Sequence, residues 1–399
     1  KALSEDFKND RDVLQIINSI NDKELHEIMT NLAGHDIEEL EEVFSKNRKS
    51  SNPTCFICYT VKGFGLPLAG HKDNHSGIMN MDQFKNYQNS MKIRKGMEWD
   101  KTEGMKISKK IFEENISKNV FYKNNGNRSF RDSHIQIKEL NIKFKNYTST
   151  QEAFGQILGT IGKRKDNQTK RIVTTSPDVT VSTSLGGWVN QRDIFSRNAK
   201  SDIFKEKSVT SAQKWKYSPL GQHIELGIAE NNLFLLLSAL GLSENIFGTR
   251  LLPIGTIYDT FIGRGLDALN YALYIDARFI IVGTPSGVTL SHEGGAHQSI
   301  VTPSLGIAQP NLIYYEPVFA DELNILLFWA LNSIQKKEGK SVYFRLSTKK
   351  LNQPNRELSN IISQDIINGG YWFLNLEDKV DIIFVCTGVI LDQVIKAVK

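Results

Sequence analysis

The sequence predicts an α/β fold of the doubly wound type, with parallel sheets covered by helices on both faces. Three short apolar segments are typical of buried strands: 171–175, 279–283 and 342–346. Between and around them lie segments with apolar residues at helical spacing: 229–240, 265–274 and 321–334. Strands that alternate with helices favour parallel sheets with both faces buried. In such sheets the loops after the carboxyl ends of the strands carry the chemistry, so candidate residues are sought there.

The composition is that of an ordinary globular protein. The chain has 399 residues, 40% hydrophobic and 23% charged, with a formal net charge of +5. That length suits two to three domains, and the small, dispersed positive excess without a base-stacking motif gives no reason to expect nucleic-acid binding. No apolar run reaches the roughly 18 residues of a membrane span, and the first ten residues do not form a signal peptide. Three cysteines make no disulfide framework, which favours a cytoplasmic location.

The N-terminal part is expected to be helical over 1–48, with Asp36 as the N-cap of a helix that follows it. A strand is expected at 55–61. Cys55 and Cys58 would then point to opposite faces, which argues against a metal or redox role. The glycine-rich segment 62–75 contains His71 and His75, and a mobile active-site lid is favoured over a metal site.

Four regions follow from these observations: the tail of one domain at 1–79, a polar, partly helical linker at 80–148, a central domain at 149–350 and the beginning of a last domain at 351–399. The central domain opens with Ser149 and Glu152, which have the spacing of a capping box. In the last region a folded unit begins near Gly369, with a strand expected at 381–386 and a helix after it.

Glu230 stands at the entry of the apolar helix predicted at 229–240. A carboxylate there is either a favourable charge at a helix start or a buried acid, and position alone favours the first.

The loop 284–298 holds His292, Glu293 and His297 between glycines, which allow a backbone to approach a ligand closely. A proton relay, a metal site and solvated loop histidines all remain open. Tyr258 and Phe261 offer aromatic rings before a helix, for which core packing is the default interpretation.

The order of several motifs is more specific than any one of them. They are Gly-His-Asp at 34–36, Thr-Val-Lys-Gly-Phe-Gly at 60–65, Ser-Pro-Asp at 176–178, Gly-Ile-Ala-Glu at 227–230 and Glu-Gly-Gly-Ala-His-Gln at 293–298. This succession resembles the thiamine-diphosphate-dependent transketolase superfamily along almost the whole chain. The segments 221–226 and 341–348 look closest to the homodimeric type of pyruvate dehydrogenase first component, with transketolase as the near rival. The resemblance implies the transketolase-like, thiamine-diphosphate-binding fold.

The resemblance also implies roles at the cofactor. Glu230 would hydrogen-bond the ring nitrogen of the aminopyrimidine and so help to remove the proton from the thiazolium carbon, in a dry pocket. Tyr258 or Phe261 would stack on the pyrimidine, and Asp178 would lie near the thiazolium.

On the substrate side, the resemblance places His297 and His75, with His71 as a further candidate, where they would donate to carbonyl or carboxylate oxygens and move protons. The implied reaction is oxidative decarboxylation of a 2-oxoacid, pyruvate first, with acyl transfer to a lipoyl group on a partner acyltransferase. A homodimer with sites between subunits is expected.

One departure concerns magnesium. The family binds Mg²⁺ and diphosphate through a Gly-Asp-Gly segment followed by Asn, and no Gly-Asp-Gly occurs here. The sequence therefore predicts no metal ligand in this chain, and a fragment or one product of a split gene that is inactive by itself.

Two alternatives stay open. A transketolase would need side chains for a sugar phosphate, for which Ser182, Thr183 and Arg264 are candidates. A non-catalytic assembly subunit of the same fold would fit the missing metal segment but not the retained Glu230 and His297.

Overall fold

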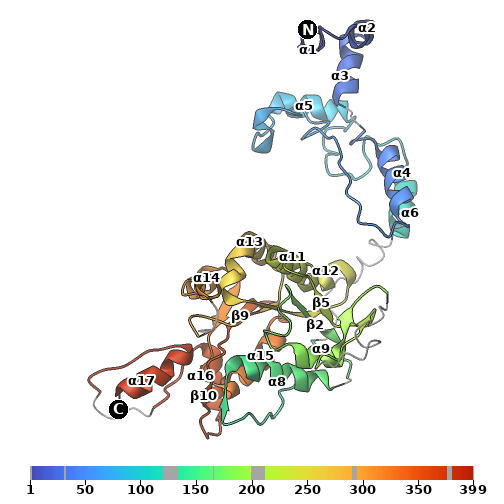
Figure 1. Cartoon of the computed structure of the whole chain (residues 1–399). Coiled ribbons are helices and arrows are strands. Elements are labelled where there is room, and N and C mark those ends of the chain that lie inside the picture. Colours follow the sequence, from blue (N-terminus) through green and yellow to red (C-terminus); the bar gives the residue numbers. More distant parts are fainter. Residues whose placement is uncertain are drawn as a thin grey trace. The chain divides into compact units, whose positions relative to one another are not determined.

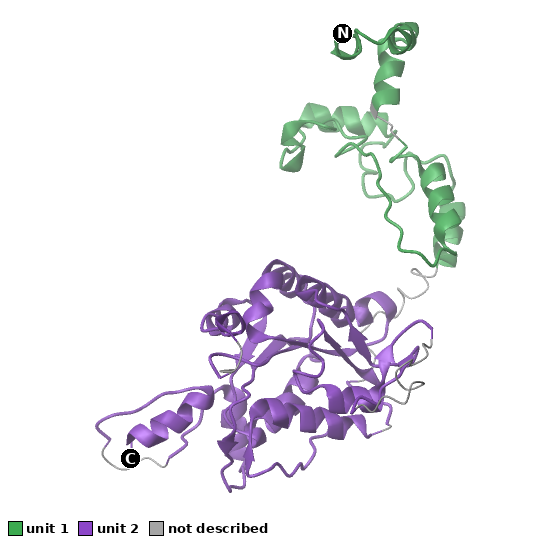
Figure 2. Cartoon of the chain, in the orientation of Figure 1, with its two compact units in different colours: residues 1–123 green, residues 124–399 purple. Residues whose placement is uncertain are grey.

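The computed structural model describes residues 2–30, 33–119, 134–164, 166–198, 212–289, 294–374 and 380–398. The chain forms two compact units, residues 1–123 and residues 124–399 (Figure 2). The division falls inside the region 80–148 that the sequence predicts to be a linker. Within the described ranges, no helix is both long and apolar enough to cross a membrane.

The first unit is helical, as predicted for residues 1–48. Its helices are α1 (Ala2–Asp6), α2 (Arg11–Ser19), α3 (Asp22–Thr30), α4 (Ile37–Asn47), the 3₁₀ helix η1 (Lys72–His75), α5 (Met81–Ser90) and α6 (Lys109–Lys118). Asp36 caps α4 as expected, since its side chain accepts hydrogen bonds from the amides of Glu38 and Glu39. The strand predicted at 55–61 is wrong: these residues belong to no helix or strand, and Cys55 and Cys58 are both exposed.

The second unit contains an eight-stranded sheet in the order β4-β3-β5-β2-β6-β7-β9-β8, and every pair of neighbours is parallel. The strands are β2 (Ile172–Ser176), β3 (Ile194–Phe195), β4 (Tyr217–Ser218), β5 (His223–Glu225), β6 (Leu252–Ile257), β7 (Ile280–Gly283), β8 (Leu312–Tyr315) and β9 (Ser341–Arg345). The three predicted strands are confirmed as β2, β7 and β9. The chain adds strands on one side of β2 and then crosses to the other, which is the doubly wound arrangement.

Helices cover both faces of this sheet (Figure 1). One face packs on α8 (Thr150–Gly162), α9 (Gly186–Arg192) and α15 (Ala320–Ser333), and the other on α11 (Glu230–Gly241), α13 (Leu266–Tyr274) and α14 (Thr302–Ala308). Strand β7 illustrates how both faces of the sheet are buried. Ile280 and Val282 lie in the first core and Ile281 in the second, so alternate side chains of one apolar strand are buried on opposite sides.

The predicted helix boundaries are close to those observed. α8 begins with the expected capping box, in which Ser149 accepts from the Glu152 amide and Glu152 reaches back to the Ser149 amide. The helices predicted at 229–240, 265–274 and 321–334 are α11, α13 and α15.

The remaining elements of the second unit are short. An antiparallel pair joins β1 (Tyr147–Thr148) to β10 (Leu351–Asn352). Smaller helices are η3 (Thr169–Arg171), α12 (Ser243–Phe247), η4 (Asp259–Gly265), η5 (Gly295–His297), α16 (Asn360–Asn368), η6 (Gly388–Ile390) and α17 (Leu391–Val398). The strand predicted at 381–386 is wrong, because these residues adopt no regular structure, whereas the helix expected after it is α17.

Candidate active site at the carboxyl ends of four strands

The topology brings the predicted residues of the second unit to one edge of the sheet. The neighbouring strands β5, β2, β6 and β7 end at Glu225, Ser176, Ile257 and Gly283. The next residues along the chain lead to Glu230, Asp178, Tyr258 and the loop that contains His297. Parallel strands place their carboxyl ends at the same edge, so the order of the strands explains why these segments converge.

Glu230 is the first residue of α11 and is 8% exposed. Position alone favoured a helix-start charge, whereas the resemblance implied a buried carboxyl. The structure adds a partner that neither interpretation included, because Arg264 Nη1 donates to Glu230 Oε1 at 2.7 Å. The Arg264 side chain is 54% exposed, so the pair lies at the boundary between the protein and solvent. The surroundings of Glu230 are therefore less dry than predicted.

A glycine makes this pair possible. Gly265 ends η4 where that helix crosses α11, and a Cβ at this position would clash with the Phe234 ring and lie 3.0 Å from the backbone oxygen of Glu230. The absence of a side chain lets η4 approach α11 closely, and this approach brings Arg264 to the Glu230 carboxyl.

Three aromatic rings form a cluster beside the same 3₁₀ helix. Tyr258 and Phe261 are stacked, with ring centroids 5.9 Å apart. The His297 ring meets both edge-on, at 5.7 Å from Tyr258 and 5.5 Å from Phe261. The Arg264 guanidinium carbon lies 3.8 Å from the centroid of the Phe261 ring, a cation–π contact. A continuous set of contacts therefore links Glu230, Arg264, Phe261, Tyr258 and His297.

Asp178 is exposed and lies in the turn after β2, with a left-handed backbone (φ 63°). Its amide donates to Glu225 Oε1 at 2.8 Å, and the Thr180 hydroxyl donates to Glu225 Oε2 at 2.5 Å. The ring of His223, which is fully buried, lies with Nε2 2.9 Å from Thr180 Oγ1 and 3.5 Å from the Glu225 carboxyl. Sequence reasoning missed Glu225 and His223. Residues two apart in a strand point to the same face, so their common side follows from the sequence, but their contact with the Asp178 loop depends on the pairing of β5 with β2.

Burial raises the pKa of the Glu225 carboxyl, but hydrogen bonds from His223, Thr180 and the Asp178 amide outweigh burial and hold that pKa below its ordinary value. Because the pKa of this acid is lower in the folded state, its contribution to stability is present above the ordinary glutamate pKa of about 4.3 and is lost as the pH falls through the folded value.

We therefore expect Glu225→Gln to be less stable than the native protein at pH 7, with a difference that narrows once the pH falls below about 4.3. Urea unfolding of both proteins across this pH range checks the prediction. A stability difference that stays constant with pH would contradict it.

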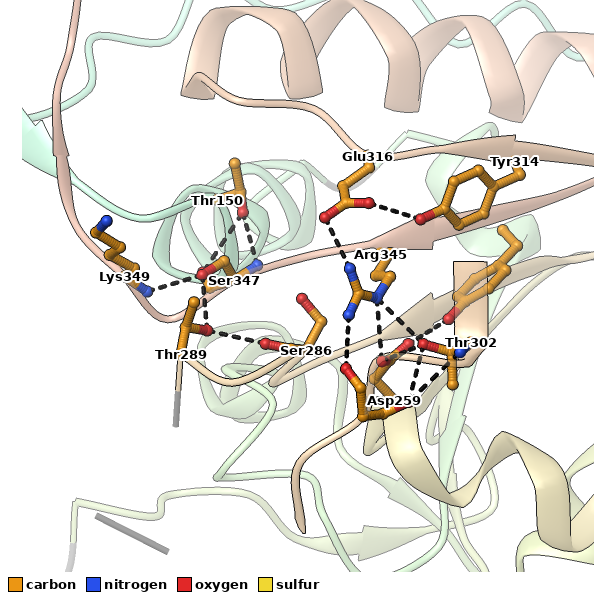
Figure 3. A network of polar contacts seen from close by, with 12 residues as sticks. Thr150, Asp259, Ser286, Thr289, Thr302, Tyr314, Glu316, Arg345, Ser347 and Lys349 are labelled. Carbon is orange, nitrogen blue, oxygen red and sulfur yellow. Dashed lines mark hydrogen bonds and ion pairs between the residues drawn. The ribbon is translucent and has the colours of Figure 1, made fainter. Parts of the chain in front are cut away.

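Sequence reasoning also missed a second group of residues, which surrounds Asp259 at the start of η4. Asp259, fully buried, accepts from the Tyr343 hydroxyl, from Thr302 Oγ1 at 2.5 Å and from Arg345 Nε at 3.1 Å. Arg345 also donates to Glu316 Oε1 at 2.8 Å, so it lies between two carboxylates (Figure 3). Burial lowers the pKa of the Arg345 guanidinium, but the charges of Asp259 and Glu316 outweigh it and raise that pKa.

This network fixes the start of η4. Asp259 is the first residue of that helix and directly follows Tyr258, while Phe261 and Arg264 lie on the same short element. Anchoring of Asp259 to β9 and α14 therefore positions the aromatic cluster and the Arg264 side chain.

The other predicted residues lie in the first unit or outside the described residues. His71 and His75 belong to the first unit, where the His71 ring accepts from the Asp73 amide and His75 Nδ1 lies 2.8 Å from Lys62 Nζ. His292 and Glu293 lie outside the described residues. Within the described ranges, no three His, Cys, Asp or Glu side chains are grouped so as to hold a metal ion.

Comparison with known proteins gives a consistent class. Residues 141–354 match the family described as the pyruvate dehydrogenase E1 component middle domain. A pyruvate dehydrogenase E1 component of Cupriavidus necator is 28% identical over 228 residues, covering 56% of this chain and 25% of its own length. Transketolase 1 of Pasteurella multocida is 22% identical over 390 residues, which cover 91% of this chain and 53% of that protein. Among solved structures, a transketolase from Pichia stipitis matches with a TM-score of 0.63 at 16% identity. The match covers 91% of this chain and 52% of the transketolase chain. The chain thus spans between a quarter and about half of these relatives.

The parallel sheet with helices on both faces gives the second unit an α/β architecture of the transketolase-like fold. Within that fold, the chain belongs to the family of the pyruvate dehydrogenase E1 component middle domain.

Proposed function

We propose that this chain supplies the pyrimidine side of a thiamine-diphosphate site in an enzyme that oxidatively decarboxylates a 2-oxoacid, pyruvate first, and passes the acyl group to a lipoyl group on a partner acyltransferase. The observation that carries the proposal is the juxtaposition of Glu230 with the Phe261 ring on η4. A flat, nitrogen-rich group already lies there, since the Arg264 guanidinium makes a cation–π contact with Phe261 while it donates to Glu230. The space therefore suits an aminopyrimidine ring.

The roles follow from position and chemistry. Glu230 would bind the ring nitrogen of the pyrimidine and exchange a proton with it, and Phe261, rather than Tyr258, would stack on the ring. Asp178, held by Glu225, would lie near the thiazolium. When bound, thiamine diphosphate supplies an electron sink for the loss of carbon dioxide.

On the substrate side, His297 would donate a hydrogen bond to a carbonyl or carboxylate oxygen of the 2-oxoacid. His75 and His71 are proposed for the same side. No magnesium ligand is assigned to the described residues. A homodimer in the cytoplasm, with the lipoyl-bearing acyltransferase as partner, completes the proposal.

The family match favours a 2-oxoacid over a sugar phosphate. Of the residues considered for a phosphate, Thr183 is fully buried and donates to the Val179 carbonyl at 2.7 Å.

The test is an assay of the natural protein with thiamine diphosphate and Mg²⁺. We expect carbon dioxide release from pyruvate that depends on a lipoyl-domain acceptor. Transfer of a two-carbon unit from a ketose phosphate, without any reaction of pyruvate, would contradict the proposal.

A further inference from the structure

Arg264 makes two contacts with the groups that are proposed to hold the pyrimidine. Its Nη1 donates to the Glu230 carboxyl at 2.7 Å, and its guanidinium carbon lies 3.8 Å from the centroid of the Phe261 ring. Both contacts come from one side chain, so the guanidinium group lies against the acid and the aromatic ring at the same time. This inference rests on the proposed function, because it concerns the same two groups.

A guanidinium and a protonated aminopyrimidine present similar surfaces. Each is planar and cationic, with N–H donors at its edge for a carboxylate and a flat face for an aromatic ring. The carboxyl oxygen of Glu230 and the face of Phe261 that Arg264 covers are therefore the surfaces that the pyrimidine needs. Arg264 and the pyrimidine cannot occupy them together.

We propose that Arg264 is a built-in competitor of the cofactor: it occupies the pyrimidine position when thiamine diphosphate is absent and must swing away when the cofactor binds. The surroundings permit this movement. The Arg264 side chain is 54% exposed, so the displaced guanidinium can be hydrated at the surface.

The competitor also explains why a half-exposed arginine lies beside the site. Glu230 is 8% exposed, and a buried carboxylate without a partner is unfavourable. Arg264 compensates this charge in the cofactor-free protein. The pair of Arg264 and Glu230 thus stabilises the cofactor-free site, and the cofactor must displace Arg264 in order to bind.

The test compares thiamine diphosphate binding by the native protein, Arg264→Ala and Arg264→Lys, each titrated by calorimetry in Mg²⁺ buffer. We expect both variants to bind the cofactor more tightly, Arg264→Ala by roughly five- to tenfold, because an exposed ion pair and a cation–π contact no longer compete. Lysine keeps the charge but lacks the planar group that stacks on Phe261, so Arg264→Lys separates occupancy of the site from the general effect of a positive charge.

Weaker binding by Arg264→Ala would overturn the inference, since it would make Arg264 a ligand of the cofactor. Tighter binding by Arg264→Ala with native affinity in Arg264→Lys would overturn it as well, because charge alone would then explain the change. Absence of binding by all three proteins would refute the proposed function and this inference with it. Binding by the native protein with unchanged affinity in both variants would refute the inference alone.

Discussion

Asp259→Ala is expected to lower the free energy of unfolding by about 3–5 kcal/mol, the scale of breaking a buried ion pair by removing one partner. The carboxyl is fully buried and accepts from Arg345, Thr302 and Tyr343. Its removal leaves three buried donors without this acceptor, and only Arg345 retains another carboxylate, Glu316. Chemical denaturation followed by circular dichroism measures the loss.

A matched control is Asp392→Ala. Asp392 also pairs with a basic side chain, Lys396 at 2.9 Å, but its side chain is 34% exposed and that of Lys396 is 65% exposed. This pair is screened by water, so its loss should leave the free energy of unfolding close to the native value. Equal effects of the two substitutions would show that the Asp259 network does not stabilise the fold.

Glu230→Gln is expected to remove at least about 2–4 kcal/mol of transition-state stabilisation, roughly thirty- to a thousandfold in rate. Glutamine has nearly the same shape, and its carbonyl oxygen can still accept from Arg264. It cannot exchange a proton with the pyrimidine nitrogen. Pyruvate-dependent carbon dioxide release by the natural protein, at saturating cofactor, measures the effect.

Glu244→Gln is the control for this substitution. Glu244 lies on α12, beyond the other end of α11, and is also paired with an arginine, Arg250 Nε at 2.6 Å. Loss of that pair should leave the rate near the native value. Near-native activity in Glu230→Gln would refute the assigned role of Glu230.

Hydrophobic periodicity correctly predicted those helices and strands whose own residues show which side chains are buried. The apolar segment that became β7 and the leucine-rich helix α11 carry their burial pattern in their own residues. The segments 55–61 and 381–386 are equally apolar in sequence, yet Ile57 and Val385 are 80% and 92% exposed. A strand requires a neighbouring strand, and composition alone does not supply one.

The candidate site was predicted only as far as local sequence allows. Local pattern drew attention to Glu230, Tyr258, Phe261 and His297, because each follows a strand or lies at the start of a helix, but their roles at a cofactor came only from the resemblance to the transketolase superfamily. The pairings that organise them join residues far apart in the chain: Glu230 to Arg264 across 34 positions and Asp259 to Arg345 across 86. Nothing in the local pattern of either residue indicates its partner, so these contacts emerged only from the fold.

The most direct test of the account concerns Glu230 and the thiazolium carbon of the cofactor, which lies between the nitrogen and the sulfur of that ring. Exchange of the proton on that carbon for deuterium can be followed by rapid acid quench and proton NMR, without any substrate. We predict that the native protein accelerates this exchange over free thiamine diphosphate and that Glu230→Gln loses about 10²- to 10⁴-fold of the acceleration. Equal exchange rates in the two proteins, with the cofactor bound to both, would contradict the central claim.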